Sequence, residues 1–324
     1  MTMSAVMLHV WTEDYMQIIR FLPPEGGNPS VGIVCDEGIR TLLHVSSVAK
    51  LLRMRSDDIR RACEHSTESS LKLKEVQLLP PVDEMTEVWA AGVTYRRSQE
   101  ARMTESVSAA SVYDRIYGAP RPELFFKSAA WRVVGHLEPI SVRADSEINV
   151  PEPELAVVIN RYQEIVGFTI CNDVSSRTIE GENPLYLPQA KMYLGGCAVG
   201  PGITPAWTIE DPHRLSIEAT VIRNGETVWS GTASTEELHR TVTDLVDWLH
   251  RAEAFPHGVV LSTGTCLVPD LPFSIGSGDQ VEISIEGLGT LANPVVSGIG
   301  PMRWLTESFT DPTQRLSRTN GVLR

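Results

Sequence analysis

Three carboxylates stand out in the sequence because of their spacing. Glu152 and Glu154 flank Pro153 just before an apolar run, and Asp173 ends the next apolar run, EIVGFTICND. In a β-strand, residues i and i+2 project from the same face, so Glu152 and Glu154 would point together. A solvated pair of carboxylates at the mouth of a strand has the same pattern, so this pair alone does not define a site.

Asp173 turns the pair into a candidate metal site. A hairpin of residues 154–160 and 165–172 would bring Asp173 back beside Glu152 and Glu154. Three converging oxygen donors without a nearby His or Cys favour a hard cation, Mg²⁺, Mn²⁺ or Ca²⁺. Zinc is not favoured because it prefers nitrogen or sulfur ligands. The sequence therefore predicts a divalent-metal site.

Two further features could serve an anionic substrate. Lys191 follows a Pro-containing turn, LPQAK, and residues 262–269, STGTCLVP, form a turn of small residues. A lone lysine is usually a solvated surface charge, but beside a cation it could act as a base or bind a carboxylate. Hydroxyl and N–H groups of a small-residue turn can hold an anion, although such turns are common. For Lys191 and for the turn, both the structural and the substrate-binding interpretation stay open.

The composition limits the class of protein. The chain has 324 residues with a formal net charge of −13, which disfavours nucleic acid as a partner. Its five cysteines are scattered without a C-x-x-C pair, as expected of a protein from a reducing compartment. No stretch approaches the roughly 18 apolar residues of a membrane span, and the N-terminus has no signal-peptide pattern. We therefore expect a cytoplasmic protein without a membrane partner.

The elements that must position these residues fall into three parts. Residues 1–82 predict a small N-terminal α/β domain: strand patterns lie within 16–43, and two short helices follow, the second capped by Ser56. The pair Pro80-Pro81 interrupts both helix and strand and is a plausible domain boundary. Residues 83–300 form the larger, strand-rich domain, and residues 301–324 are a polar C-terminal tail.

The larger domain contains one strong hairpin signal and one clear helix signal. Asn224-Gly225 separates two alternating runs, which is typical of a two-residue hairpin turn. Ser234 and Glu237 have the spacing of a capping box, so a helix is predicted over residues 234–249. Many short strands with few helices indicate an α+β, β-rich fold with a mixed sheet arranged as a sandwich, roll or barrel.

Seven segments, taken together, resemble the fumarylacetoacetate hydrolase family. They occur in the family's order: GVTY (92–95), PELFFK (122–127), PEPELAVVIN (151–160), GFTICNDVSSR (167–177), LPQAK (187–191), LSTGT (261–265) and IEGLGTLANPV (285–295). The resemblance implies a β-rich, roll-like catalytic domain preceded by a small N-terminal domain. It also implies that Glu152, Glu154 and Asp173 bind Mg²⁺, Mn²⁺ or Ca²⁺, and that the chain forms a homo-oligomer, a dimer or a tetramer.

Within this family, the segment GENPLYLPQAK and the short gap between Glu154 and Asp173 look most like the sugar-acid dehydratase branch, which acts on 2-keto-3-deoxy-pentonates. The resemblance implies that Glu123 and Lys191 lie at the substrate as catalytic and binding residues. By the same comparison, Thr265 is expected to contact the substrate. Which of Glu123 and Lys191 serves as acid and which as base stays open.

One departure from the family pattern bears on the reaction. Many hydrolases of the family carry G-x-N-Y-x-x-H, whose histidine helps to activate water, whereas this chain has Ser98 at that position. A serine hydroxyl is no general base near neutral pH without a partner. The substitution favours dehydration over metal-dependent hydrolysis or decarboxylation of a 1,3-diketo acid, which is the alternative enzyme activity. A non-catalytic binding protein on the same scaffold is the second alternative.

The predicted reaction is the dehydration of a 2-keto-3-deoxy-pentonate. A 2-keto acid can chelate the cation through its carboxylate and carbonyl oxygens, which would favour enolisation at C3. Loss of the C4 hydroxyl would then give 2,5-dioxopentanoate. The expected small-molecule partner is therefore a 2-keto acid, and the expected cofactor is Mg²⁺, with Mn²⁺ or Ca²⁺ as alternatives.

Overall fold

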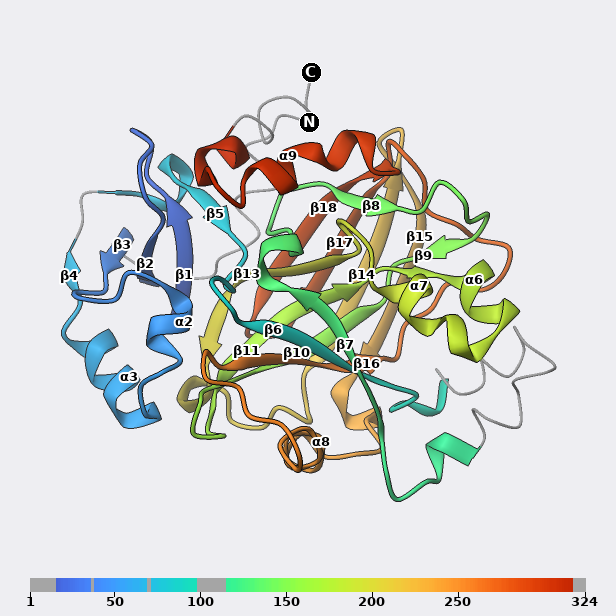
Figure 1. The fold of residues 1–324 in the computed structure, drawn as a ribbon, viewed down its shortest axis with the longest axis horizontal. Coiled ribbons are helices and arrows are strands. Elements are labelled where there is room, and N and C mark those ends of the chain that lie inside the picture. The colour runs from blue at the N-terminus through green and yellow to red at the C-terminus, as the bar shows by residue number, and fades with distance from the viewer. Residues whose placement is uncertain (1–15, 36–37, 69–70, 98–114, 317–324) are drawn as a thin grey trace.

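The structure is a computed structural model that describes residues 16–35, 38–68, 71–97 and 115–316. Within these ranges the chain is mostly β-strand, with short helices at the periphery (Figure 1). The strands are β1 (Gln17–Leu22), β2 (Ser30–Cys35), β3 (Gly38–Thr41), β4 (Thr67–Glu68), β5 (Gln77–Leu79), β6 (Glu87–Gly92), β7 (Glu123–Ala129), β8 (Ile140–Val142), β9 (Asn149–Val150), β10 (Pro153–Ile159), β11 (Ile165–Asp173), β12 (Ser175–Ser176), β13 (Cys197–Pro205), β14 (Ser216–Arg223), β15 (Glu226–Ser234), β16 (Val259–Thr265), β17 (Gln280–Ile285) and β18 (Gly289–Ser297).

The helices are short, and none among the described residues is long and apolar enough to cross a membrane. The α-helices are α2 (Val48–Leu51), α3 (Ser56–Glu64), α6 (Arg177–Glu182), α7 (Leu187–Lys191), α8 (Val242–Leu249) and α9 (Arg303–Glu307). The 3₁₀ turns are η1 (Leu73–Glu75), η2 (Ala130–Arg132), η3 (Pro184–Tyr186), η4 (Ala206–Thr208), η5 (Thr235–Glu237), η6 (Gly300–Met302) and η7 (Pro312–Arg315).

Two large sheets form the body of the molecule. The larger has the strand order β4-β3-β2-β1-β13-β11-β10-β16-β6-β7, with β5 added on β1, and the smaller has the order β15-β14-β17-β18-β8. Most neighbouring strands are antiparallel, but β16 pairs with β6 and β18 pairs with β8 in parallel. The expectation of a β-rich fold with mixed sheets and few helices is therefore confirmed.

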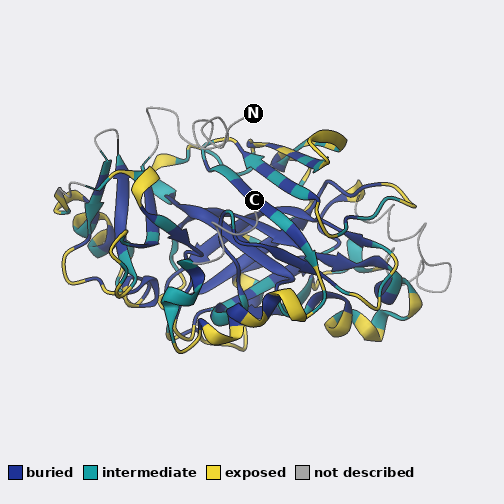
Figure 2. Ribbon diagram, turned by 90° about the horizontal axis from the view of Figure 1, so that it is seen from above, coloured by how far each residue is buried: buried dark blue, intermediate teal, exposed yellow. Residues whose placement is uncertain are grey.

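The two sheets enclose one continuous apolar core. Alternate residues of β10, including Leu155 and Val157, pack in the same cluster as Ile217 of β14 and Ile283 of β17. Figure 2 shows the central strands as the most buried part of the molecule, with exposed residues gathered in peripheral helices and loops. Burial of apolar side chains from both sheets stabilises this sandwich-like arrangement.

Strand β10 is covered on both faces, which explains its unbroken apolar sequence. Val158 belongs to a second cluster, formed with Val166 of β11 and Leu51 of α2, and every residue of β10 is buried. A strand with two buried faces carries apolar residues at consecutive positions instead of alternating ones. Polar side chains at the start of such a strand are consequently buried as well.

Both predicted hairpins are present. Strands β10 and β11 pair antiparallel from Pro153↔Asn172 to Ile159↔Ile165, and β14 pairs antiparallel with β15. Asn224 and Gly225 have φ angles of 52° and 82°, the left-handed conformation that a two-residue type I′ turn requires at both positions. The turn chemistry therefore predicted the second hairpin correctly.

The N-terminal strands continue the large sheet. Strand β1 pairs with β13 through Ile18↔Ile203, so the sheet is continuous from the N-terminal region into the central strands. The division into domains at residue 82 therefore stays an interpretation. Helix α3 starts at Ser56 with Arg55 at the N-cap position, and no side-chain hydrogen bond caps it. The prediction that Ser56 caps this helix was wrong by one residue.

Other differences lie in the C-terminal third. Ser234 and Glu237 form their capping box, but it begins the 3₁₀ turn η5, while α8 begins at Val242 and is capped by Thr241. The segment expected to be a polar tail is packed through residue 316. Its helix α9 buries Trp304 in the core between the sheets.

Buried ion pairs also fasten the end of the described chain. Arg315 pairs with Glu138 at 2.6 Å and donates to the carbonyl oxygen of Val133 at 3.2 Å. Nearby, Arg20 pairs with Asp83 at 3.1 Å, and Arg20 lies within electrostatic range of Arg315 and Glu138. We call these four charged residues the C-terminal latch.

Candidate metal and substrate site

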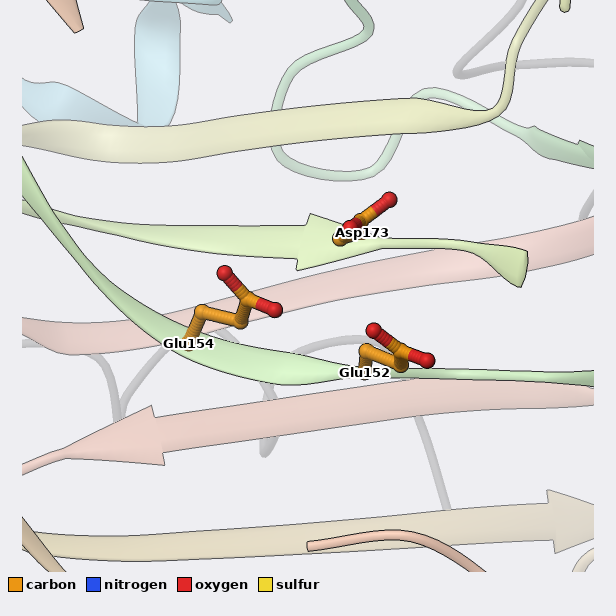
Figure 3. A group of neighbouring side chains, drawn as sticks. All are labelled: Glu152, Glu154 and Asp173. Atoms are coloured by element: carbon orange, nitrogen blue, oxygen red, sulfur yellow. The ribbon is translucent and has the colours of Figure 1, made fainter. Parts of the chain in front are cut away.

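Glu152, Glu154 and Asp173 converge at the end of the central hairpin. Glu152 immediately precedes β10, Glu154 is the second residue of β10, and Asp173 is the last residue of β11. The main-chain N–H of Asp173 donates to the carbonyl oxygen of Glu152 at 3.0 Å, which fixes their relative position. One carboxylate oxygen of each residue lies within 4.8 Å of the others, and all three are buried. Figure 3 shows the three carboxylates facing a common space.

Glu154 is held from the side of β16. Its Oε2 accepts hydrogen bonds from the Ser262 hydroxyl at 2.5 Å and from the Gly264 N–H at 2.9 Å. Burial raises the pKa of Glu154 well above its usual value, and repulsion from Asp173 and Glu152 raises it further. Both of these hydrogen-bond donors to Glu154 are uncharged, so a cation bound there would relieve the repulsion.

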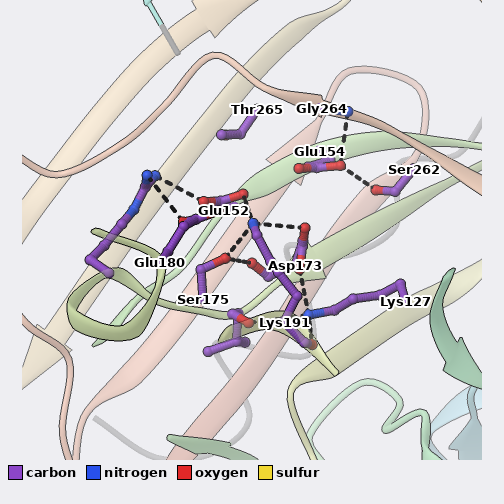
Figure 4. Close-up of polar contacts among 12 residues, drawn as sticks. Lys127, Glu152, Glu154, Asp173, Ser175, Glu180, Lys191, Ser262, Gly264 and Thr265 are labelled. Carbon is purple, nitrogen blue, oxygen red and sulfur yellow. Dashed lines mark hydrogen bonds and ion pairs between the residues drawn. The ribbon is translucent and has the colours of Figure 1, made fainter. Parts of the chain in front are cut away.

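Lys191 lies against two of these carboxylates. It is the last residue of α7 and is 1% exposed, so its side chain is no solvated surface charge. Its Nζ donates to Glu152 Oε2 at 2.6 Å, to Asp173 Oδ2 at 3.0 Å and to the Ser175 hydroxyl at 2.6 Å. Figure 4 shows this ammonium group between the carboxylates. All three of its hydrogen-bonding directions are consequently used by side-chain acceptors.

Glu123 and Thr265 line the same pocket as the three carboxylates and Lys191. Glu123 is half-buried at the start of β7, and its carboxylate lies against Gly92 of β6. A Cβ at Gly92 would stand only 2.2 Å from Glu123 Oε2, so glycine is needed to leave room for this carboxylate. The structure thus places all six predicted site residues around one pocket.

The hydroxyl of Thr265 is largely occupied by the main chain. It is placed to donate to the carbonyl oxygen of Pro153 at 2.9 Å or Leu267 at 3.0 Å, and it accepts from the Leu267 N–H at 3.2 Å. A hydroxyl has one proton and two lone pairs, so one acceptor position is left for another partner. Thr265 therefore shapes the turn as well as lining the pocket.

Three charged residues of the site were not predicted. Arg177 of α6 pairs with Glu152 at 2.8 Å and lies 3.6 Å from Glu180, and Glu180 lines the pocket. Lys127 of β7 forms an ion pair with Asp173. Arg177 falls within the matching segment GFTICNDVSSR and Lys127 within PELFFK, but sequence alone gave no reason to place them against the carboxylates. Alternation along β7 could have indicated Lys127, because it shares parity with Glu123.

These buried charges form one site cluster: Lys127, Glu152, Glu154, Asp173, Arg177, Glu180 and Lys191. All seven are at most 3% exposed. Within this cluster, among the residues that the structure describes, four side chains are carboxylates and three are cations. Figure 4 shows how most of them are linked by polar contacts. Ser98, where a histidine stands in many hydrolases, lies outside the described residues.

The chain is similar to proteins of known family. A model of the fumarylacetoacetate (FAA) hydrolase C-terminal domain matches residues 87–296. A probable 2-keto-3-deoxyxylonate dehydratase from Haloferax volcanii is 44% identical over 265 residues, covering 81% of this chain and 90% of the relative. The 2-dehydro-3-deoxy-D-arabinonate dehydratase from Saccharolobus solfataricus is 38% identical over 263 residues, covering 80% and 87%.

Solved structures of dehydratases are also similar to this chain. A 2-keto-3-deoxy-D-arabinonate dehydratase complexed with magnesium and 2,5-dioxopentanoate matches with a TM-score of 0.74 and 34% identity, over 87% of this chain and 99% of that chain. Its apo form matches with a TM-score of 0.77 and 33% identity, over the same shares. The likeness therefore extends over most of the chain.

Proposed function

The chain belongs to the fumarylacetoacetate hydrolase family, and within it we propose that the protein is a divalent-metal-dependent dehydratase of a 2-keto-3-deoxy-pentonate. The observation that carries this proposal is the pocket itself. It combines the carboxylates of Glu152, Glu154 and Asp173 with the side chains of Lys191 and Glu123. The two dehydratases similar to this chain, and the solved dehydratase complex with magnesium and 2,5-dioxopentanoate, support the same reaction.

The donor set fits a divalent cation. Glu152, Glu154 and Asp173 offer only oxygen atoms, which suits Mg²⁺, Mn²⁺ or Ca²⁺. The site cluster has one more carboxylate than cations, and the half-buried Glu123 adds another nearby. Burial raises the pKa of Glu154, and repulsion from Asp173 and Glu152, which this excess of carboxylates implies, raises it further. We propose Mg²⁺ as the metal, in keeping with the magnesium of the solved complex.

When bound, the divalent cation would stabilise the negative charge that develops on the carbonyl oxygen of a 2-keto acid as its C3 proton leaves. The protein must then accept that C3 proton and supply a proton to the departing C4 hydroxyl. Lys191 makes three hydrogen bonds as a donor, so its ammonium group has no lone pair with which to accept a proton. We assign proton acceptance at C3 to Glu123, and proton donation or substrate-carboxylate binding to Lys191.

The pocket has apolar walls beside its charged groups. Phe125, Val93 and Leu187 supply apolar surface beside the charged groups, and Thr265 lies on the side of β16. Exclusion of water by such walls strengthens electrostatic interactions with a bound keto acid. We propose that Thr265 contacts the substrate through its remaining hydroxyl lone pair or its methyl group.

The reaction can be tested with purified protein, Mg²⁺ and the 2-keto-3-deoxy acids derived from arabinonate and xylonate. We expect ¹³C NMR to show loss of water and formation of 2,5-dioxopentanoate from at least one of them. No turnover of either acid, together with rapid carbon–carbon cleavage of an acylpyruvate, would contradict the proposal. That outcome would instead support the metal-dependent hydrolase or decarboxylase of a 1,3-diketo acid.

We also propose that the enzyme is cytoplasmic and forms a homo-oligomer. All five cysteines are free, four of them buried, which is compatible with a reducing compartment. Sedimentation analysis of the purified protein is expected to give a dimer or a tetramer, and a monomer at micromolar concentration would contradict the second proposal.

A further inference from the structure

Lys127 is a buried lysine at an irregularity of strand β7. Pairing between β6 and β7 shifts from Val88↔Ser128 to Trp89↔Phe126, so within the described register Lys127 stands opposite no residue of β6. This is the pattern of a β-bulge, which redirects side chains and is frequent beside active sites. Lys127 is 1% exposed. In Figure 4 its side chain approaches Asp173 from the side away from Glu180 of α6.

The ammonium group of Lys127 holds the main chain on both sides of the site. Its Nζ donates to the carbonyl oxygen of Lys191 at 2.6 Å and to that of Val174 at 3.1 Å, and it pairs with Asp173 Oδ1. Two donor directions of the ammonium group are therefore used by main-chain carbonyl groups, and its charge is paired with Asp173. Lys127 is not among the described residues that line the pocket, so its action on a substrate must be indirect.

The two buried lysines therefore have different partners. Lys191 contacts side chains only, through Glu152, Asp173 and Ser175, whereas Lys127 contacts two main-chain carbonyl groups. Side-chain contacts can exchange when a metal or a substrate arrives. The main-chain contacts of Lys127, at Val174 and at Lys191, instead fix the backbone from which the Lys191 side chain projects.

We propose that Lys127 is the positioning residue for Lys191. It fixes the main chain at the end of α7 relative to β11, so that the Lys191 ammonium group faces the same pocket as the Glu123 carboxylate. The inference rests on the proposed function, because Lys191 acts on the substrate only if the pocket performs the dehydration. Displacement of a reacting group by about 1 Å can cost roughly 10²-fold in rate.

The charge of Lys127 has a separate effect on metal binding. An ammonium group in contact with Asp173 adds positive potential where a divalent cation would bind. The main chain of Asp173 stays in place without Lys127, because it pairs with Cys197 of β13 and its N–H donates to the carbonyl oxygen of Glu152. Removal of the Lys127 charge should consequently leave metal affinity unchanged or increase it, while catalysis falls.

The variant Lys127→Met tests this separation because it keeps the length of the side chain and removes the charge. We expect kcat per folded molecule to fall about 10²-fold, with the KM for the keto acid within about 3-fold of wild type because Lys127 does not line the pocket. Mn²⁺ titration followed by electron paramagnetic resonance is expected to give a dissociation constant equal to or below that of wild type. Wild-type turnover tests the proposed function separately, and the Mn²⁺ titration needs no substrate.

The matched control is Arg315→Met, which removes the cation of a buried ion pair in the C-terminal latch. This variant should lower the melting temperature and keep wild-type kcat and Mn²⁺ affinity. If Lys127→Met behaves like this control, or binds Mn²⁺ more weakly with unchanged kcat, the positioning role is contradicted. If Lys127→Met does not fold, Lys127→Arg decides: its planar guanidinium keeps the charge but not the geometry. We expect its kcat to fall about 10-fold, and a wild-type kcat would overturn the proposal.

Discussion

The site cluster and the C-terminal latch are both buried groups of charged side chains, yet they are built differently. In the latch, Arg315 pairs with Glu138 and Arg20 pairs with Asp83, so each carboxylate has its own cation. The latch carboxylates also accept main-chain hydrogen bonds, such as that from the Gly135 N–H to Glu138 at 2.7 Å. The charges of the latch therefore balance without any further ligand.

The charges of the site cluster do not balance in this way. Its four carboxylates share three cations, and the pKa of Glu154 is raised by burial and by repulsion from its neighbours. A buried charge without full compensation costs free energy, which a structural ion pair avoids. Burial of charge alone therefore does not distinguish the two clusters; the unbalanced charge and the adjoining pocket do.

Removal of a proposed metal ligand should have the largest effect on turnover. Asp173→Asn takes away one of the three converging carboxylates, so we expect turnover to fall on the order of 10³-fold, similar to the loss of a charge-stabilising group in other enzymes. Steady-state kinetics and Mn²⁺ titration would measure both consequences. The matched change in the latch, Glu138→Gln, should leave both unchanged; a loss of turnover there equal to that of Asp173→Asn would remove the distinction between the clusters.

A smaller effect is expected from a methyl group added beside Glu123. Gly92→Ala would place a Cβ 2.2 Å from Glu123 Oε2 and displace this carboxylate, which lies at the end of a flexible side chain. We expect kcat to fall about 10²-fold, with little change in thermal stability. Gly276→Ala is the control, because nothing lies within 4 Å of the added Cβ. Wild-type kcat in Gly92→Ala would argue against a catalytic role of Glu123.

The raised pKa of Glu154 predicts how metal affinity depends on pH. Its pKa in the folded protein lies above the ordinary value of 4.5, so this carboxyl group keeps its proton over part of the range above that value. Its ionisation therefore destabilises the metal-free fold as pH rises through the folded pKa, and metal binding releases the proton. We expect affinity for Mn²⁺ to rise up to about tenfold per pH unit below that pKa.

Calorimetric Mn²⁺ titrations at several pH values, in buffers with different ionisation enthalpies, would detect the released proton. Metal affinity that falls as pH rises would contradict the interpretation of Glu154. Glu154→Gln is the matching variant, and it should weaken metal binding and remove this proton release.

The smallest effect on turnover is expected from the latch. Arg315→Met leaves Glu138 buried without its cation, which typically costs about 3–5 kcal/mol of unfolding free energy. Denaturant unfolding should show this loss, while kcat at a temperature well below the transition stays at the wild-type value. A large loss of kcat without loss of stability would show that the latch and the site are coupled.

The convergence of the three carboxylates could be predicted from the sequence because its geometry is local. Glu152 and Glu154 are two residues apart, and Asp173 ends the partner strand of the same hairpin, so period and register suffice to bring them together. Arg177 and Glu180 could not be found in this way. Their approach to the carboxylates depends on the packing of α6 against the hairpin, which sequence spacing does not encode. Lys127 could have been indicated only by its parity with Glu123 along β7, which does not show that β7 lies beside the hairpin.

The start of helix α8 shows the same limit for the fold. The capping box of Ser234 and Glu237 forms as predicted, because it depends only on residues within one turn. Long-range contacts then interrupt the helix: Leu238 forms a β-bridge with Tyr95, and the N–H of His239 donates to the carbonyl oxygen of Thr94 at 2.9 Å. The main chain at residues 238–239 therefore bonds to residues 94–95, which follow β6, instead of continuing the helix. Helix α8 begins only at Val242.

The central claim is that the unbalanced carboxylate cluster binds one divalent cation that dehydration requires. The most direct measurement titrates EDTA-treated protein with Mn²⁺ and records bound Mn²⁺ and formation of 2,5-dioxopentanoate in the same samples. We predict that turnover rises in proportion to bound Mn²⁺, reaches its maximum at one ion per chain, and is absent without metal. Full turnover by the metal-free protein, or one bound ion per chain without dehydration of either pentonate, would contradict the account.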